Sequence, residues 1–406
     1  MRQPLKHYFK EFSMSQPKGK IPQHIKPKKF LHPQTNSSIV QILVEVQDPR
    51  KPSCNFQHSL PTIILISLVG VLCGAKDWEE IIQCAEGMID WISKYVDTSN
   101  GIPSTQTMKR LMSLIPTESL RRLLENLRST ISDSGEDIIA IDGKTLRGSR
   151  GWNEKDRALH LLHAWSTEHR ICIGQVSVDE KSNEITAIPE LIESLELKGT
   201  IVTADALNTQ KTTAAAIINK NADYILPVKG NHKDLYEDIR LLFEEANEKD
   251  FRGFDANQSQ TIEKSAGRIE ERYYDLLDAS ELPAREEWIG CRSVGRVIRK
   301  RTKKDKTSEE VCFYITSLDV DSSQFANGVR KHWGVENGLH LSLDVIFRED
   351  HHRYQNRVGA ANLSLLRKVA LGILSKDTSL KCGRAAKQMR AATSAAYRDH
   401  LFKNCF

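Results

Sequence analysis

Five short apolar segments between residues 137 and 228 constrain the fold of this 406-residue chain more than any other feature. Each has the length of a strand, and the intervals 188–197 and 210–219 show apolar residues at helical spacing instead. Three strands in succession, followed by helix, strand, helix and strand, predict an α/β fold with a mixed sheet and flanking helices. The predicted strands are Asp137–Asp142, Leu159–Ser166, Ile171–Val178, Thr200–Asp205 and Asp223–Val228.

The pattern on either side of this region divides the rest of the chain. Residues 41–132 show helical spacing and are predicted to form a small α-helical domain. Strand-like segments return between about 248 and 320, which indicates a β-rich insertion within one α/β domain over 133–375. Residues 1–40 are predicted to be a basic flexible arm, because they lack apolar periodicity, and residues 376–406 a basic C-terminal tail.

Positive charge is concentrated in three segments, although the net charge of the chain is only +5. Residues 1–40, 291–306 and 353–406 hold an excess of Lys and Arg, and the remainder is acidic. This pattern is typical of a protein that binds a polyanion such as nucleic acid, although charge runs alone are more often solvated surface. The most apolar segment, 60–73, is too short to span a bilayer, and no signal peptide is recognisable, so a cytoplasmic protein without a membrane segment is expected.

Two of the predicted strands end in an aspartate. Asp142 closes the segment IIAID and Asp205 closes IVTAD. The carboxyl ends of strands in α/β folds border the crevice where functional sites form, although a single such aspartate is more often an ordinary turn residue. Two carboxylates on adjacent strands supply the hard oxygen ligands that Mg²⁺ prefers, and two such ions can support an in-line phosphoryl displacement.

A third carboxylate is expected from the last helical segment. Its acidic residues are Glu336, Asp344, Glu349 and Asp350. Glu336 is favoured, because helical spacing places His332, Glu336 and His340 in one row beside Trp333. The row lacks the spacing of a zinc-binding HExxH motif, so a zinc site is disfavoured.

Longer motifs surround these residues: IDGKTLRGS (141–149), VDEKSNEITAIPELIESLELKGTIVTADAL (178–207), DYILPVKGNH (223–232) and VRKHWGVENGLHLSLDVIFRED (329–350). They closely resemble the DDE insertion-sequence transposases that include the H-repeat-associated proteins of enteric bacteria. DPRKPSCNFQH, VLCGAKDWEEI and GIPSTQTMKRL, which lie within residues 46–127, resemble the helical DDE-associated domain of that family.

The resemblance implies an RNase H-like (retroviral-integrase-like) fold with the acidic triad Asp142, Asp205 and Glu336. These three residues would be catalytic and would also bind the metal. Asp142 would bridge two Mg²⁺ ions, Asp205 would hold one and Glu336 the other, and Mn²⁺ could replace Mg²⁺. The implied partner is double-stranded DNA, both the terminal inverted repeats of the element and the target, and a homo-oligomer would assemble on it at the nucleoid.

Further residues near the triad are candidates for contacts with DNA, although each is more often simply exposed. Trp333 in particular is predicted to pack its helix against the sheet rather than to stack on a base. The candidates are Lys144, Arg147, Lys229, Asn231, His232, Arg330, His332 and Trp333.

Three functions fit these features. The first is a transposase that cleaves DNA and transfers strands at the ends of an insertion sequence. The second is a catalytically silent, transposase-derived DNA-binding protein, which the intact carboxylates disfavour. The third is an RNase H-like nuclease without strand transfer, which would have no need of the β-rich insertion. The first function predicts that Asp142 and Asp205 lie on neighbouring strands and that Glu336 reaches them from a helix.

Overall fold

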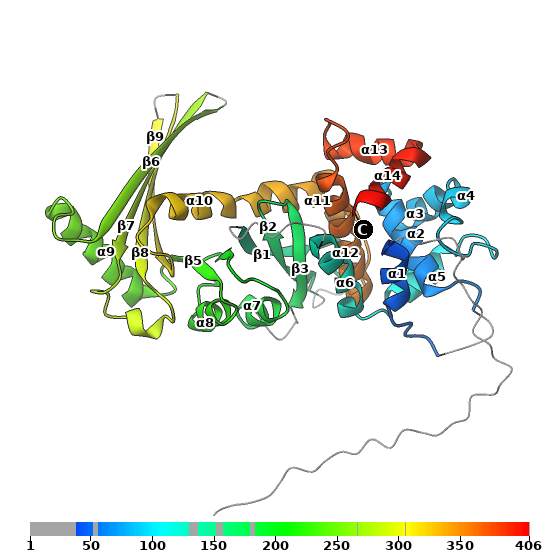
Figure 1. Cartoon of the computed structure of the whole chain (residues 1–406), viewed down its shortest axis with the longest axis horizontal. Helices are drawn as coiled ribbons and strands as arrows, with labels where there is room; N and C mark the ends of the chain where they lie inside the picture. Colours follow the sequence, from blue (N-terminus) through cyan, green and yellow to red (C-terminus); the bar gives the residue numbers. More distant parts are fainter. Residues whose placement is uncertain are drawn as a thin grey trace, which may run out of the picture.

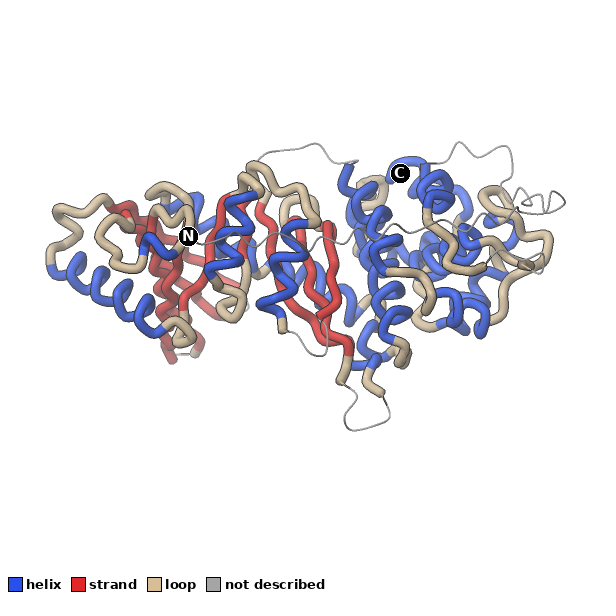
Figure 2. The backbone as a smooth tube through the Cα atoms, turned by 90° about the horizontal axis from the view of Figure 1, so that it is seen from below, coloured by secondary structure: helices blue, strands red, loops and turns tan. Residues whose placement is uncertain are grey.

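The computed structural model of the protein describes residues 38–51, 56–129, 137–151, 157–178, 183–265, 267–304 and 306–405. The molecule is elongated, with a helical body at one end, a central sheet, and a β-rich arm at the other end (Figure 1). A view at right angles shows the same three parts following one another along the long axis (Figure 2).

Helices from both ends of the described chain build the helical body. Helix α2 lies within it and all but one of its residues are buried, because the sequence LPTIILISLVGVL is apolar on every face. Helix α12 packs against α2, α5, α6 and strand β3, so it joins the body to the sheet. The helices are α1 (Ser38–Glu45), α2 (Leu60–Leu72), α3 (Trp78–Glu86), α4 (Ile89–Ile92), α5 (Thr105–Met112), α6 (Thr117–Ser129), α12 (Arg357–Lys376), α13 (Arg384–Thr393) and α14 (Ala395–Cys405).

Helix α12 is also, among the described residues, the one helix long and apolar enough to cross a membrane. In this fold it is a core helix, since 89% of its apolar stretch is buried inside the protein. Its apolar character is therefore accounted for by packing between the helical body and the sheet.

The central sheet confirms the predicted mixed α/β fold. Its first five strands are β1 (Ile138–Leu146), β2 (Leu159–Ser166), β3 (Ile171–Val178), β4 (Ile201–Thr203) and β5 (Asp223–Val228). Strands β1, β2 and β3 form an antiparallel meander, whereas β4 pairs parallel with both β1 and β5. The crossovers contain α7 (Glu184–Glu193) and α8 (Lys211–Asn219), and the resulting order β3-β2-β1-β4-β5 is that of an RNase H-like fold.

The arm continues this same sheet. Helix α9 (Lys233–Glu248) precedes the strands β6 (Ala256–Ser265), β7 (Arg268–Asp278), β8 (Ser293–Lys303) and β9 (Lys306–Thr316). Strand β9 pairs antiparallel with β5, so the order extends to β5-β9-β8-β7-β6 and gives nine strands in one sheet. The strand-like segments 270–277, 289–299 and 310–318 of the sequence predict three strands here, and β6 is the additional one. It is a polar edge strand that carries no apolar signal.

Helix α10 (Ser322–His332) crosses from the arm to the centre of the sheet and contacts β1, β4, β5, β6 and β7. Two glycines allow this close approach, because a Cβ at Gly295 would overlap the ring of Phe325 and a Cβ at Gly328 would overlap Ile225. The chain then forms the π-helical turn η3 (Val335–His340) and the short helix α11 (Leu341–Val345).

The two ends of the described chain differ in part from the sequence prediction. Helix α1 begins at Ser38, and Ile39 and Val40 are buried, so the last three residues of the predicted arm belong to the helical body. The remainder of that arm, residues 1–37, lies outside the described residues. The predicted basic tail contains the helices α13 and α14, which pack on α12, because its apolar residues Ala391, Leu401 and Phe402 are buried.

Asp377, which follows α12, connects these last helices to the body. Its carboxylate accepts hydrogen bonds from the Tyr397 hydroxyl (2.6 Å) and the Ser379 hydroxyl (2.6 Å) and lies 3.5 Å from the Lys387 ammonium. Burial by itself would raise the pKa of Asp377, but the hydrogen bonds from Ser379 and Tyr397 outweigh it and hold the pKa at about 2. A carboxyl with a depressed pKa stabilises the fold above about pH 4, and this contribution is lost as the pH falls toward 2.

We expect Asp377→Asn to destabilise α13 and α14 by about 1–3 kcal/mol at neutral pH, because it removes the charge and leaves buried donors poorly paired. Urea unfolding together with amide hydrogen exchange in residues 384–405 measures the effect. The matched control is Asp250→Asn, whose side chain is 88% exposed. Equal unfolding free energies for Asp377→Asn and the control would contradict this role.

Candidate metal centre and DNA-facing cleft

The sheet brings the two predicted aspartates to one place. Strands β1 and β4 pair in parallel with Ala140 opposite Thr203, so Asp142 and Asp205, each two residues further on, emerge side by side. Glu336 comes from the turn η3 after α10. All three carboxylates line one cleft of about 840 Å³ between the centre of the sheet and the arm.

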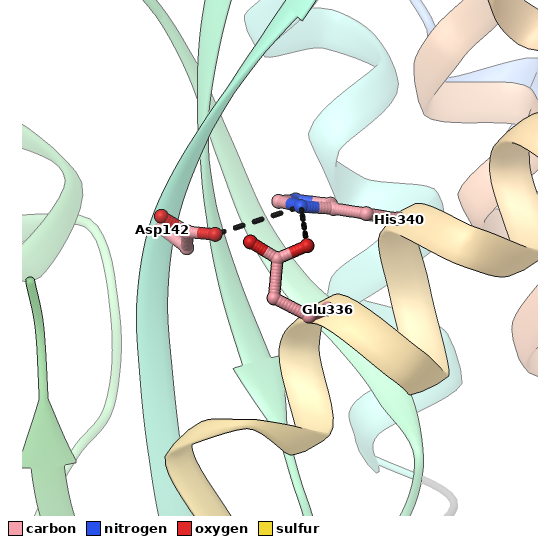
Figure 3. Close-up of side chains that lie close together, drawn as sticks. All are labelled: Asp142, Glu336 and His340. Atoms are coloured by element: carbon pink, nitrogen blue, oxygen red, sulfur yellow. Dashed lines mark ion pairs between the residues drawn. The ribbon is translucent and has the colours of Figure 1, made fainter. Parts of the chain in front are cut away.

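Asp142 and Glu336, which line the cleft, form a close cluster with the buried His340 (Figure 3). His340 Nδ1 lies 3.5 Å from Asp142 Oδ2 and 3.4 Å from Glu336 Oε2. One ligand atom from each residue lies within 4.8 Å of the other two. This spacing suits a cation held between them, with the His340 nitrogen as an additional donor that the sequence-based ligand set omits.

The charges in the cleft also favour a bound cation. Burial raises the pKa of Asp142 to about 7, against a hydrogen bond from the Gly143 amide, and the negative charges of Glu336, Asp205 and Glu184 raise it further. Burial likewise raises the pKa of Asp205, whose carboxylate accepts a hydrogen bond from the Asn208 amide. A divalent cation would relieve this repulsion and stabilise the ionised carboxylates, so the residues present fit the metal.

The π-helical turn changes the predicted row of His332, Glu336 and His340. A π-helical turn is wider than an α-helical one, so residues four apart no longer keep one regular face. His340 still contacts Glu336, but His332 forms a hydrogen bond with Thr203 Oγ1 at 2.9 Å. Burial lowers the pKa of His332 to about 4, so this ring is neutral and positions α10 against β4.

Four of the eight predicted DNA-contacting residues line the cleft, and two more are exposed outside its lining. Lys229, Arg330, His332 and Trp333 line the cleft. Arg147 has an 84% exposed side chain, and Asn231 is exposed with its amide donating to Ala206 O at 2.9 Å.

Two of the predicted contacts are corrected by the structure. Lys144 is buried, and its ammonium lies among the carboxylates of Asp344, Glu349 and Asp350 instead of facing the cleft. His232 Nε2 forms a hydrogen bond with Thr209 O at 2.6 Å, and its ring packs edge-on against Trp288. His232 therefore stabilises the loop that contains Thr209. In both cases the polar partners come from distant parts of the sequence.

Trp333, which the sequence predicts to pack α10 against the sheet, contacts the sheet through Arg299 on β8. More than half of the residue (55%) is exposed, and the Arg299 guanidinium lies 5.9 Å from the centre of the ring. The indole face therefore borders the open cleft, where it is available to a ligand.

The opposite wall of the cleft is a basic surface on the arm. The sequence identifies the basic segment 291–306 but not the face on which its side chains lie. This surface consists of side chains from one face of the arm, which alternate with side chains on the reverse face. The sequence RKR at 299–301 could have predicted this surface, because residues two apart in a strand, here Arg299 and Arg301, lie on the same face of the sheet. The arginines of this wall are Arg268 and Arg272 on β7 and Arg299 and Arg301 on β8, and Arg330 of α10 also lines the cleft.

An RNase H-like sheet with one carboxylate within β1, a second just after β4 and a third in a helical turn after α10 defines the DDE class of proteins. The chain belongs to the DDE transposase family: the model of the family "Transposase DDE domain" matches residues 133–373, and the DDE_Tnp_1-associated model matches residues 40–127. A transposase of this family is a DNA-processing protein, and its DDE domain implies a divalent metal.

Curated relatives match along most of the chain. YncI of Escherichia coli O157:H7 is 34% identical over 375 residues, which are 91% of this chain and 95% of that protein. The H repeat-associated protein YhhI of E. coli K12 is 36% identical over 348 residues, or 84% of this chain and 91% of that protein. A solved piggyBac transposase synaptic complex with hairpin DNA aligns with 90% of this chain and 77% of that one, at 10% identity and a TM-score of 0.40, a likeness too low to support an argument.

The raised pKa of Asp142 gives a prediction for the metal-free protein. Between pH 4 and 7 the folded state retains a proton that the unfolded state has released, so stability falls as the pH rises through this range. Asp142→Asn removes the ionisation. In a chelating buffer at pH 8 we expect its melting temperature to exceed that of the wild type by roughly 2–4 °C, with no difference at pH 4.

A divalent cation should reverse this order at pH 8 by stabilising the wild type alone. Differential scanning fluorimetry across the pH series measures both effects. Asp319→Asn serves as the control, because the Asp319 side chain is 86% exposed and should leave the pH profile unchanged. Identical pH profiles for the wild type and Asp142→Asn would rule out the charge crowding in the cleft.

Proposed function

We propose that the protein is an active transposase that cleaves DNA and transfers strands at the ends of an insertion sequence, with Asp142, Asp205 and Glu336 as its catalytic metal ligands. The observation that supports this most is the arrangement of one cleft, which has the three carboxylates on one side and a wall of arginines on the other. The carboxylates suit Mg²⁺, with Mn²⁺ as a substitute, and the arginines suit phosphates.

The chemistry requires that a phosphate, a nucleophile and the metal meet at one point. Metal ions bound by such carboxylates lower the pKa of water and neutralise charge on the leaving oxygen. Asp142 lies between Asp205 on the neighbouring strand and Glu336 on η3, so it is suited to share two ions, with Asp205 holding one and Glu336 the other. Water would be the first nucleophile and a 3′-hydroxyl the second.

The register of the arm supports a DNA-binding role for one of its faces. Residues that pair directly across strands share a face of a sheet. On the face toward the cleft, the strand pairing brings together six cations and three carboxylates: Arg268, Arg272, Arg299, Arg301, Lys303 and Lys306, with Glu263, Glu270 and Glu310. The reverse face over the same span carries two of each: Lys264 and Lys300, with Glu271 and Glu309.

This excess of cations on one face matches a duplex that passes from the arm to the metal centre. In this proposal the partner is double-stranded DNA, first the terminal inverted repeats and then the target. A homo-oligomer assembles on the DNA, and the protein acts in the cytoplasm at the nucleoid. A silent DNA-binding protein or a nuclease without strand transfer would share the arm surface, and the experiments below separate these possibilities.

Replacing any triad residue should separate cleavage from binding. We expect Asp142→Ala, Asp205→Ala and Glu336→Ala each to abolish cleavage of a labelled duplex carrying the element end, and to bind that duplex with nearly wild-type affinity. The reason is that cleavage depends on the metal, whereas binding depends on Lys and Arg contacts to phosphates. Asn at the aspartates should be almost as damaging, because it keeps the shape and loses the charge.

A gel-shift assay at fixed salt runs beside the cleavage assay. An Asp205→Ala protein that still cuts would remove Asp205 from the site. A wild-type protein that binds the end but never cuts it would indicate the silent DNA-binding alternative. Cleavage without joining to a target duplex would indicate the nuclease.

The arm surface predicts a salt-dependent loss of binding. We expect the double variant Arg268→Gln/Arg301→Gln to bind DNA of any sequence more weakly. The negative slope of log K against log salt should become shallower by roughly 1.8, about 0.9 for each lost phosphate contact. Both arginines are partly exposed, and their ion pairs with Glu270 are long, at 3.8 and 3.7 Å. Lys264→Gln/Lys300→Gln removes two charges from the reverse face and is the matched control. Equal salt slopes for the two double variants would contradict the assignment of the face.

A further inference from the structure

A fourth carboxylate lies beside the triad without belonging to it. Glu184 is the first residue of α7, and its charge raises the pKa of both Asp142 and Asp205. Both of its oxygens are engaged: Oε1 lies 2.6 Å from His160 Nε2, and Oε2 accepts a hydrogen bond from Asn208 Nδ2 at 2.7 Å. The hydrogen bond from His160 lowers the pKa of Glu184, so the group is ionised.

These contacts connect Glu184 to the backbone that carries each aspartate. On one side, Asn208 bonds to Glu184 through its side chain and to Asp205 Oδ1 through its backbone amide, at 3.0 Å. On the other side, His160 Nδ1 bonds to Thr145 Oγ1 at 2.8 Å, and Thr145 lies on β1 three residues after Asp142.

Gly143 shows how closely this cluster fits against β1. A Cβ at this position would lie 2.5 Å from His160 Nε2 and 2.6 Å from Glu184 Oε1, so any larger residue would displace these two side chains. The Gly143 amide also donates to Asp142 Oδ1 at 2.9 Å. Glu184 therefore packs directly behind the group that would share both metal ions.

We propose that Glu184 is a positioning residue of the metal centre, which fixes the Asp205 loop against β1 and adds a fourth negative charge behind the cation. This inference rests on the proposed function, because it assumes that the triad binds metal. Glu184 needs no contact with the ion, since its hydrogen bonds act through Asn208 and through the strand that carries Asp142. Outer-shell partners of this kind typically contribute 10–100-fold to metal affinity.

Two substitutions separate the charge of Glu184 from its shape. Gln at position 184 can accept from His160 and donate to Asn208 Oδ1, a buried atom with no partner among the described residues, if the Asn208 amide turns over. Glu184→Gln thus keeps the connections and removes the charge, whereas Glu184→Ala removes both. Glu190→Gln, on an exposed residue of the same helix, is the matched control.

The test is a titration of the full-length protein with Mn²⁺, followed by the electron paramagnetic resonance signal of free Mn²⁺. We expect Glu184→Ala to weaken binding roughly 10–100-fold and Glu184→Gln to weaken it less, with Glu190→Gln unchanged. In the cleavage assay, raising Mn²⁺ should restore much of the activity of Glu184→Gln, whereas a purely structural defect would lower the rate at saturating metal as well.

The variant Asp142→Asn distinguishes a failure of the proposed role of Glu184 from a failure of the proposed metal centre. If Asp142→Asn loses Mn²⁺ binding while Glu184→Ala and Glu184→Gln stay within twofold of the wild type, the role of Glu184 is refuted and the triad stands. If Asp142→Asn itself binds Mn²⁺ normally, the proposed metal centre fails, and the role of Glu184 fails with it. If Glu184→Ala does not fold, the Mn²⁺ affinity of Glu184→Gln alone tests the role of Glu184. Thermal unfolding in the presence of a chelator checks that Glu184→Gln is folded.

Discussion

The parallel pairing of β1 with β4 is the constraint on which the site depends. It covers only three residue pairs, yet it fixes the register that places Asp142 and Asp205 side by side. A shift by one residue would turn the side chains of β4 to the other face and separate the two carboxylates. The pairing is held by a buried apolar strand on each side, so the energy that keeps two like charges together comes from packing rather than from the site itself.

The third carboxylate reaches this point by a different route. Helix α10 starts at the arm, crosses the sheet by way of close contacts at Gly295 and Gly328, and ends in the π-helical turn that carries Glu336. The same helix therefore borders both the arm and the metal centre. This explains why Arg330 and Trp333 face the arginines of the arm, while Glu336 and His340, within ten residues, face Asp142.

Much of the fold follows from the sequence because its signals are local. The apolar segments predict β2, β3 and β5 residue for residue, whereas β1 continues past Asp142 to Leu146 and β4 is only three residues long. The two aspartates in these segments still predict which carboxylates meet. What the sequence does not reveal depends on tertiary contacts. Strand β6 is polar and forms only because β7 offers it a paired edge. No residue pattern in the sequence distinguishes the π-helical turn from an α-helix. The roles of Lys144 and Glu184 depend on partners that are distant in the sequence.

The single continuous sheet has a mechanical consequence. Because β9 is hydrogen-bonded directly to β5, the arm is joined to the metal centre by a backbone ladder and not by a linker. Such a connection resists hinge bending, so in the proposed function a duplex bound by the arm would keep a fixed distance to the carboxylates. A transposase acts on several phosphates in turn. With a rigid protein, each new phosphate would reach the carboxylates because the DNA moves relative to the protein, and the length of the arm would set the distance between the bound segment and the reacting phosphate.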